Sequence, residues 1–223
     1  MPQSVKKRIV VLGGTGRIGN KISEIAIKRG YEVVCLGRSA SVENTPLGAI
    51  PFQGNVTDIN TILEAIKGAD VIILALSIPR KSNSPFASVI GPLDLHSSSM
   101  RLLLNALENT DTKRIIKISA QGVGDSRNRT GILFRILINI SNLRFAFKDH
   151  ERADNMLKKS DLDWTIIRPP ILKDDILNQK IRGGESLVTR SNTSISRTDL
   201  AQWAVDIVDN SEWFRRCITV SVE

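Results

Sequence analysis

Continuously apolar runs alternate along this chain with stretches in which apolar residues recur every three or four positions. Val71–Leu76 is apolar throughout, whereas Ile59, Ile62, Leu63 and Ile66 follow helical spacing. The first pattern is typical of strands buried on both faces of a sheet, and the second of helices that cover such a sheet. The alternation predicts an α/β fold, a Rossmann-type doubly wound parallel sheet.

Turn and cap residues between these stretches set the expected bounds. We expect strands at Lys7–Leu12, Glu32–Leu36, Ala49–Gln53, Val71–Leu76, Arg114–Ser119, Trp164–Arg168 and Cys217–Val222. We expect helices at Arg17–Arg29, Leu95–Leu107 and Glu151–Lys159, and a last helix striped by Leu200, Trp203, Ala204, Ile207 and Val208. No repeat or low-complexity linker interrupts the series, which predicts a single domain over residues 1–223.

Three glycines follow the first strand and open the first helix. Gly13, Gly16 and Gly19 are spaced as G-x-x-G-x-x-G. In a dinucleotide site the first glycine takes a tight turn, the second lets the backbone approach a pyrophosphate, and the third lets helix and strand pack closely. The helix N-terminus adds unpaired N–H groups and a partial positive charge. This context favours dinucleotide binding over a glycine turn that merely joins strand to helix.

Five motifs together resemble the NAD(P)H-binding branch of the atypical short-chain dehydrogenase/reductase superfamily, which includes NmrA-like proteins and the flavin reductase (biliverdin IXβ reductase) type. They are Gly13-Gly14-Thr15-Gly16-Arg17-Ile18-Gly19, Gly37-Arg38-Ser39, Gly54-Asn55-Val56-Thr57-Asp58, the segment from Ser160 to Pro170 that contains Asp163-Trp164-Thr165-Ile166-Ile167-Arg168-Pro169, and Ile195-Ser196-Arg197-Thr198-Asp199-Leu200-Ala201. The resemblance covers nearly the whole chain. It implies a reductase-like protein with a nicotinamide cofactor.

The resemblance also implies where the cofactor lies. Thr15, Arg17 and Ile18 join the three glycines around the phosphates, and Asn55 and Val56 take the place of an Asp-Val pair beside the adenine. Ala75, Leu76 and Ser77 end the fourth strand and are expected on the pyrophosphate and ribose side, at the crevice where open α/β sheets bind ligands. Ordinary strand-end packing is compatible with the same three positions.

The end of the second strand distinguishes the two nicotinamide cofactors. NAD enzymes usually place an acidic residue there, which accepts hydrogen bonds from the ribose 2′-OH. Here Cys35-Leu36-Gly37 offers no carboxylate, and Arg38 offers a guanidinium suited to a phosphate. We therefore expect NADP(H) to be preferred over NAD(H). The alternative is that Arg38 is a surface arginine in a polar loop.

The catalytic positions depart from the family pattern. Typical members carry Tyr-x-x-x-Lys, and the alignment places Ala146 at the tyrosine and His150 at the lysine. The only tyrosine, Tyr31, starts the second strand, on the wrong side of the fold. Tyrosine-driven alcohol oxidation is therefore disfavoured.

Asp149-His150-Glu151-Arg152 resembles a stretch of the flavin reductase type, in which hydride transfer to a conjugated ring needs positioning more than a strong acid. His150 and Ser119 are the candidate catalytic residues. His150 is expected to donate a hydrogen bond or proton, and Ser119 to orient the nicotinamide or a substrate carbonyl. Helix-start packing for His150 and a plain strand-end role for Ser119 are the alternatives. We interpret His96 as non-catalytic.

Two functions follow from these residues. The leading hypothesis is an NADPH-dependent reductase of a flavin, quinone or tetrapyrrole-like small-molecule acceptor. The second is an NmrA-like redox sensor that binds NADP(H) without turnover, which the missing tyrosine favours. An epimerase- or dehydratase-type accessory protein is a third possibility.

Charge and composition narrow the partners. The net charge is +8 and the pI about 9.8, but the basic residues are scattered and aromatics make up 4% of the chain, which leaves little for base stacking. We expect no nucleic acid partner, and a monomer or homodimer. Cys35 and Cys217 lack metal-ligand spacing, so no metal site is expected. No signal peptide or run of about 18 apolar residues is evident, so we expect a cytoplasmic protein without a transmembrane segment.

The segment from Arg127 to Lys148 mixes basic and apolar residues without one clean stripe. It follows the fifth strand at the edge where ligands bind, so we expect a mobile lid over the nicotinamide end of the cleft. A dimer contact, a membrane-surface contact or a core helix are the alternatives.

Overall fold

The structure, a computed structural model, describes residues 6–174 and 178–223. Its strands are β1 (Arg8–Leu12), β2 (Glu32–Gly37), β3 (Ile50–Gln53), β4 (Val71–Leu74), β5 (Arg114–Ile118), β6 (Asp163–Arg168), β7 (Ile171–Lys173), β8 (Ile181–Gly184), β9 (Ser194–Ser196) and β10 (Arg216–Val222). Its α-helices are α1 (Arg17–Lys28), α2 (Ile59–Ala65), α3 (Leu95–Leu107), α4 (Ile132–Ile140), α5 (Leu143–Lys158) and α6 (Arg197–Asp206). Short 3-10 helices lie at Gly124–Arg129 and Ser211–Trp213.

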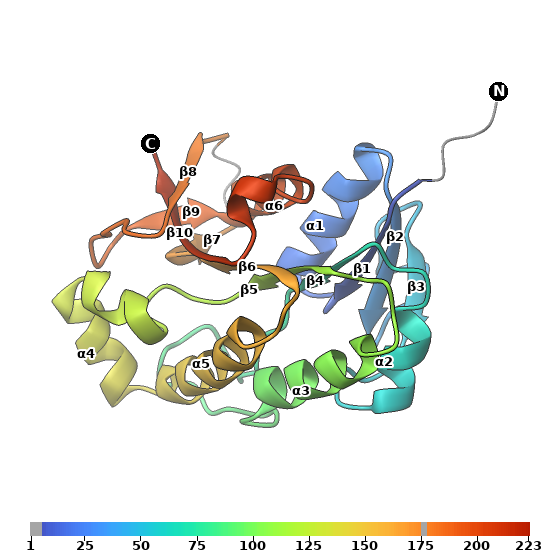
Figure 1. The fold of residues 1–223 in the computed structure, drawn as a ribbon. Coiled ribbons are helices and arrows are strands. Elements are labelled where there is room, and N and C mark those ends of the chain that lie inside the picture. The colour runs from blue at the N-terminus through green and yellow to red at the C-terminus, as the bar shows by residue number, and fades with distance from the viewer. Residues whose placement is uncertain (1–5, 175–177) are drawn as a thin grey trace.

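An eight-stranded sheet with the order β3-β2-β1-β4-β5-β6-β10-β8 forms the centre of the molecule (Figure 1). Neighbouring strands are parallel except β8, which pairs antiparallel with β10 at one edge. From β1 the chain builds the sheet outward through β2 and β3, and it then returns to β4 and builds in the opposite direction. The point where the order reverses lies between β1 and β4, where open α/β sheets bind their ligands.

Two buried layers hold the helices to the sheet, because successive residues of a buried strand point to opposite faces. Ile9 and Val11 of β1 join the layer under α1 and α6, whereas Val10 and Leu12 join the layer under α2, α3 and α5. Figure 1 shows these two groups of helices on opposite sides of the sheet. The predicted single-domain, doubly wound architecture is confirmed, with one antiparallel edge strand added.

Several predicted bounds were wrong. The strand expected at Val71–Leu76 ends at Leu74, so Ala75, Leu76 and Ser77 lie in the loop after it. The helix expected from Glu151 begins at Leu143. Its buried face carries the polar residues Asp149, His150 and Asp154, which break the apolar stripe that marks a helix in sequence. Strands β7, β8 and β9 were not predicted, because they are short and β8 contains two glycines.

None of the helices in the two described stretches is long and apolar enough to cross a membrane.

Candidate functional site

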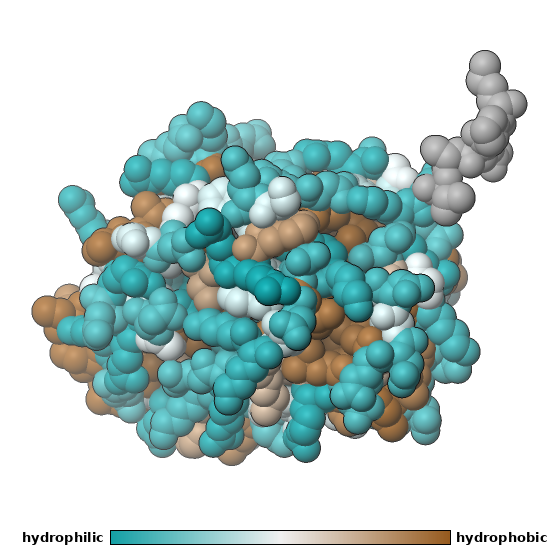
Figure 2. All heavy atoms as spheres, in the orientation of Figure 1, coloured by the Kyte–Doolittle hydropathy of each residue, from teal (hydrophilic) through white to brown (hydrophobic). Residues whose placement is uncertain are grey.

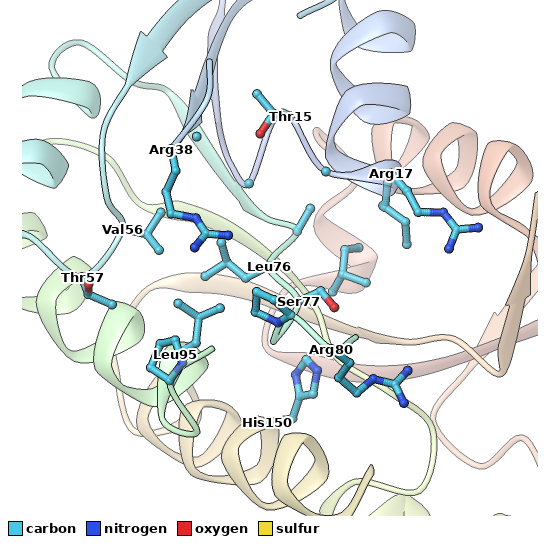
Figure 3. Close-up of a pocket in the computed structure, with 18 of the residues that line it drawn as sticks. Thr15, Arg17, Arg38, Val56, Thr57, Leu76, Ser77, Arg80, Leu95 and His150 are labelled. Atoms are coloured by element: carbon cyan, nitrogen blue, oxygen red, sulfur yellow. The ribbon is translucent and has the colours of Figure 1, made fainter. Parts of the chain in front are cut away.

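A pocket of about 460 Å³ opens at the carboxyl ends of the central strands (Figure 3). It brings together residues that the sequence separates widely, from the loops after β1, β2, β3, β4 and β5 and from the buried face of α5. The predicted site residues that line it are Gly13, Thr15, Gly16, Arg17, Ile18, Arg38, Asn55, Val56, Ala75, Leu76, Ser77, Ser119 and His150. Gly19 alone among the predicted residues does not line it.

The three glycine positions differ in backbone conformation and in what an added side chain would meet. Gly13 has a φ of +88°, which favours glycine, and a Cβ on Gly19 would collide with the backbone oxygen of Gly13. Gly16 has an ordinary φ of −76°, and an added Cβ would meet the Gly13 oxygen at 3.1 Å and the Ala75 oxygen at 3.9 Å. A side chain at Gly16 would therefore fit only if the Gly13 oxygen moved by a few tenths of an ångström, and Gly16 itself lines the pocket. This is the geometry of a cradle for a closely approaching ligand.

The first turn of α1 is open to an anion. Gly16 caps the helix without any side-chain hydrogen bond, and the first turn carries no acidic residue. Unpaired backbone N–H groups at such a helix start bind phosphate readily.

The pocket wall is strongly basic. Arg17, Arg38, Arg80 and Arg197 line it, and the described lining contains no Asp or Glu. Arg17 and Arg197 both contact the carboxylate of Asp174, the latter at 2.7 Å. Across residues 6–174 and 178–223, Arg38 makes no ion pair, and its side chain reaches into the pocket from the end of β2 in Figure 3. Such a lining suits a ligand with several phosphates.

Asn55 and Val56 lie in the loop after β3. Val56 is buried and offers an apolar wall. The Oδ1 atom of Asn55 accepts a hydrogen bond from the backbone N–H of Thr57 at 3.1 Å, in a local turn. One lone pair of this oxygen is therefore occupied. Asn55 can still offer a ligand two N–H donors and one acceptor lone pair.

A buried polar network lies behind the other end of the pocket. Lys117 of β5 donates to Asp154 Oδ1 at 2.7 Å and to His150 Nδ1 at 3.1 Å, and the Lys117 and Asp154 side chains are 2% and 1% exposed. Ser119 donates its hydroxyl hydrogen to Asp154 Oδ2 at 2.9 Å. Arg168 Nη2 lies 3.5 Å from the same oxygen. The carboxylate is thus compensated from three sides, as a buried charge requires.

These contacts fix the hydrogens that face the pocket. An ion-paired lysine has only donors, so Nδ1 of His150 must accept and Nε2 must carry the hydrogen. Burial, and then the Lys117 charge, hold the pKa of His150 well below 6.5, so the imidazole stays neutral. Figure 3 shows this ring reaching from α5 into the pocket. Since the Ser119 hydrogen is directed to Asp154, the Ser119 oxygen presents lone pairs. A neutral donor and an acceptor therefore face a ligand together.

Two buried neighbours hold His150 in place. His96 at the start of α3 stacks on it, with ring centroids 3.7 Å apart and planes 25° apart. Burial, and then His150, hold the pKa of His96 well below 6.5. Asp149 accepts from the backbone N–H groups of His96 and Ser97 at 2.7 and 3.2 Å, so the N-terminal end of α3 is fastened to α5. Helix capping here belongs to Asp149, whereas His150 is left for the pocket.

Sequence reasoning did not assign Lys117, Asp154, Arg80 or Arg197 to the site. A signal for Lys117 and Asp154 was present in the sequence. Lys117 is a lysine within the otherwise apolar second half of β5, and Asp154 follows His150 by four residues, which places both on one helix face. Pairing between a strand and a distant helix is not visible in either pattern alone.

No tyrosine lines the part of the pocket that the structure describes. The hydroxyl of Tyr31 donates to Asp209 at 3.1 Å, and neither Tyr31 nor Ala146 is among the lining residues. None of the residues from Arg127 to Lys148 lines it either. The segment that we expected to form a lid instead forms a short helical turn, helix α4 and the first part of α5, and it does not contribute to the pocket lining.

Comparisons with known proteins show the family and the fold. A family model described as NAD(P)H-binding matches residues 13–211. The uncharacterized protein YwnB of Bacillus subtilis is 24% identical over 97% of this chain and 99% of its own. The decarboxylating sterol-4-alpha-carboxylate 3-dehydrogenase of Dictyostelium discoideum is 36% identical over 69 residues, which are 30% of this chain and only 21% of that protein.

Solved structures match the fold over nearly its whole length. A short-chain dehydrogenase/reductase from Veillonella parvula, solved in complex with NADP, superposes with a TM-score of 0.78 at 19% identity, covering 97% of this chain and 95% of its own. The sheet order, the glycine loop and the family match over most of the chain lead to one conclusion. This chain belongs to the NAD(P)H-binding family, and its fold is that of the short-chain dehydrogenase/reductase structure on which it superposes.

Proposed function

We propose that this protein is an NADPH-dependent reductase that transfers hydride to a conjugated small-molecule acceptor of the flavin or quinone class. The observation that carries the proposal is the pocket itself. Four arginines and no described carboxylate line it, and it ends on a neutral histidine and a serine oxygen.

We assign each part of the cofactor to a region of the lining. Gly16 and the open start of α1 suit the pyrophosphate, since Gly16 lines the pocket and has no side chain to keep a ligand away from the backbone. Arg38 suits the 2′-phosphate, because it extends from the end of β2 where NAD enzymes keep an acid. Val56 and Asn55 would then flank the adenine, and Ser119 and His150 the nicotinamide. Preference for NADP(H) over NAD(H) follows from Arg38.

The bound cofactor would supply a hydride, and the residues of this chain supply position and hydrogen bonds. His150 Nε2–H donates to an acceptor oxygen on which negative charge develops as the hydride arrives. Ser119 offers an acceptor to an amide or imide N–H. Because the pKa of His150 lies well below 6.5, the imidazole is not the acid, and the proton that completes the reduction comes from water.

Acceptors with a conjugated carbonyl fit these groups better than simple alcohols do. Alcohol oxidation in this superfamily relies on a tyrosine, and none lines the described pocket. Conjugated acceptors already delocalise the added charge, so a positioned neutral donor is enough.

A turnover assay tests the proposal. The full chain is mixed with NADPH and, in turn, FMN, a soluble quinone and dichlorophenolindophenol, and NADPH consumption is followed. We expect turnover with at least one acceptor, and loss of most of it in Ser119→Ala and His150→Phe. Lys113→Met, which changes an exposed lysine next to β5, is the matched control and should be as active as the wild type.

One further function is favoured by a specific observation. Position 146, which the resemblance aligns with the tyrosine, is alanine and does not line the pocket. A redox sensor that binds NADP(H) without turnover would look the same at this position. NADPH binding without consumption of any acceptor would overturn the reductase proposal and leave the sensor.

A further inference from the structure

Helix α4 turns an apolar face to solvent. Ile132, Leu133, Ile136 and Ile140 are 66%, 74%, 48% and 61% exposed, and their spacing places them along one side of the helix. Ile138 is the buried anchor of this helix. Figure 2 shows brown apolar atoms gathered at the left edge of the view, where Figure 1 places α4. Contiguous exposed apolar surface of this kind marks an interaction site.

The chain segment that contains α4 carries charges of one sign. From Ser126 to Lys148 the chain carries four arginines and one lysine and no acidic residue. Arg129 is paired with Asp125, which precedes this stretch. Among residues 6–174 and 178–223, no ion pair involves Arg127, Arg135, Arg144 or Lys148. The α4 surface, defined as Ile132, Leu133, Ile136 and Ile140 with these unpaired basic residues, is therefore both apolar and cationic.

A second copy of the chain is a poor partner for the α4 surface. A two-fold symmetric dimer brings the same patch against itself. Unpaired positive charges would then face their own copies, with no carboxylate between Ser126 and Lys148 to compensate them. Like charges in such an interface cost free energy.

The length of α4 defines how it can meet a bilayer. Nine residues of helix are about 14 Å long, less than half of the roughly 30 Å hydrocarbon core. The helix is too short to span and has the composition of a helix that lies in the interface, with large apolar side chains on one face and basic residues around it.

We propose that the α4 surface docks this protein on an anionic lipid bilayer. The four apolar side chains enter the boundary between headgroups and acyl chains, and the unpaired arginines contact the acidic headgroups. None of these residues lines the nucleotide pocket, so docking and cofactor binding use separate surfaces. The inference therefore stands apart from the proposed reductase activity.

Vesicle sedimentation of the full chain tests the proposal. Vesicles of phosphatidylglycerol mixed with phosphatidylcholine are compared with vesicles of phosphatidylcholine alone, at low and high salt. We expect binding to the anionic vesicles only, weakened by salt because screening shortens the reach of the arginines. Leu133→Ser with Ile136→Ser should weaken binding about tenfold or more per residue. Arg127→Gln with Arg135→Gln should weaken it about fivefold per residue.

The matched control replaces exposed apolar residues elsewhere. Val42→Ser with Leu47→Ser changes side chains that are 77% and 98% exposed in the loop between β2 and β3, and should leave binding unchanged. Because all these residues are on the surface, the variants should fold, and circular dichroism checks this.

Three results would overturn the proposal. One is wild-type protein that stays in solution with anionic vesicles. Another is an α4 double variant that binds as tightly as the wild type. The third is a concentration-dependent dimer in analytical ultracentrifugation that the α4 double variant abolishes, since that result would assign the surface to a second copy.

Discussion

Lys117 has two roles: its charge compensates the buried Asp154 carboxylate, and its ammonium fixes the tautomer of His150. Replacing Lys117 by methionine removes both interactions, and their effects can be measured separately. Its ammonium donates to Asp154 Oδ1 at 2.7 Å and to His150 Nδ1 at 3.1 Å, with both partners buried. Methionine keeps the length and the apolar stem but removes every donor. Asp154 keeps Ser119 at 2.9 Å and Arg168 at 3.5 Å, and His150 loses the group that fixes its tautomer.

The cost in stability is set by the buried Asp154 carboxylate, which loses its ammonium partner and keeps only the Ser119 hydroxyl and Arg168. Breaking a buried ion pair from one side costs about 3–5 kcal/mol. In a domain of this size that corresponds to a decrease in melting temperature of about 6–20 °C. Lys117→Met combined with Asp154→Leu removes both charges, and should recover most of the lost stability because no buried charge remains unpaired.

The effect on His150 is separate from the effect on stability. The Lys117 charge is the second cause, after burial, of the low pKa of this imidazole, so the pKa should rise when the charge is removed. The chain contains two histidines, His96 and His150, so nitrogen NMR on protein labelled at histidine gives a spectrum that His96→Gln assigns. We expect wild-type His150 to be neutral with hydrogen on Nε2 from pH 6 to 8, and to become a mixture of tautomers in both variants.

Two outcomes would refute this reasoning. A wild-type His150 with hydrogen on Nδ1, or one that titrates between pH 6 and 8, would mean that Lys117 does not set its state. Lys113→Met controls for the loss of a lysine charge near β5, and should change neither the NMR signals nor the melting temperature appreciably.

Three further predictions follow from the pocket. Gly16→Val should abolish NADPH binding, because the added side chain takes up space in the pocket that Gly16 lines; micromolar binding by calorimetry, in a variant that circular dichroism shows to be folded, would contradict this. Gly19→Val should instead destabilise the protein itself, because its Cβ collides with the Gly13 oxygen, and urea unfolding measures that loss. Stability should also fall as the pH decreases below about 6.5, by up to about 2.7 kcal/mol per pH unit for two histidines, because the unfolded imidazoles bind protons that buried His96 and His150 do not. Urea unfolding at pH 7 and 5.5, with a double histidine-to-glutamine variant as control, checks the last prediction.

The elements with strong local signals could be predicted from sequence. β1, the glycine loop and α1 follow from a buried apolar run, the G-x-x-G-x-x-G spacing and a clear helical stripe, and Gly13 has the positive φ that favours glycine. Arg38 could be placed for the same reason, because it directly follows β2. All these features depend on residues close together in the chain.

Features that depend on tertiary contact could not be predicted. The first part of α5 was missed because its inner face holds polar residues that are satisfied only by β5 and α3. Lys117 gives no sign in sequence that it reaches His150, which lies on another element. The edge strand β8 pairs with β10, and its sequence Ile-Arg-Gly-Gly lacks the β-branched run of a typical strand.

Calorimetric titration of NADPH and NADH into wild type and Arg38→Ala tests the central claim most directly. One charge-assisted contact to the 2′-phosphate should be worth about 1.5–3 kcal/mol, so we expect the wild type to bind NADPH about tenfold or more tighter than NADH. Arg38→Ala should remove this preference and leave NADH affinity unchanged. Arg182→Ala, at an exposed arginine of β8 outside the pocket lining, should behave as the wild type. Equal affinities of the wild type for the two cofactors would contradict the account.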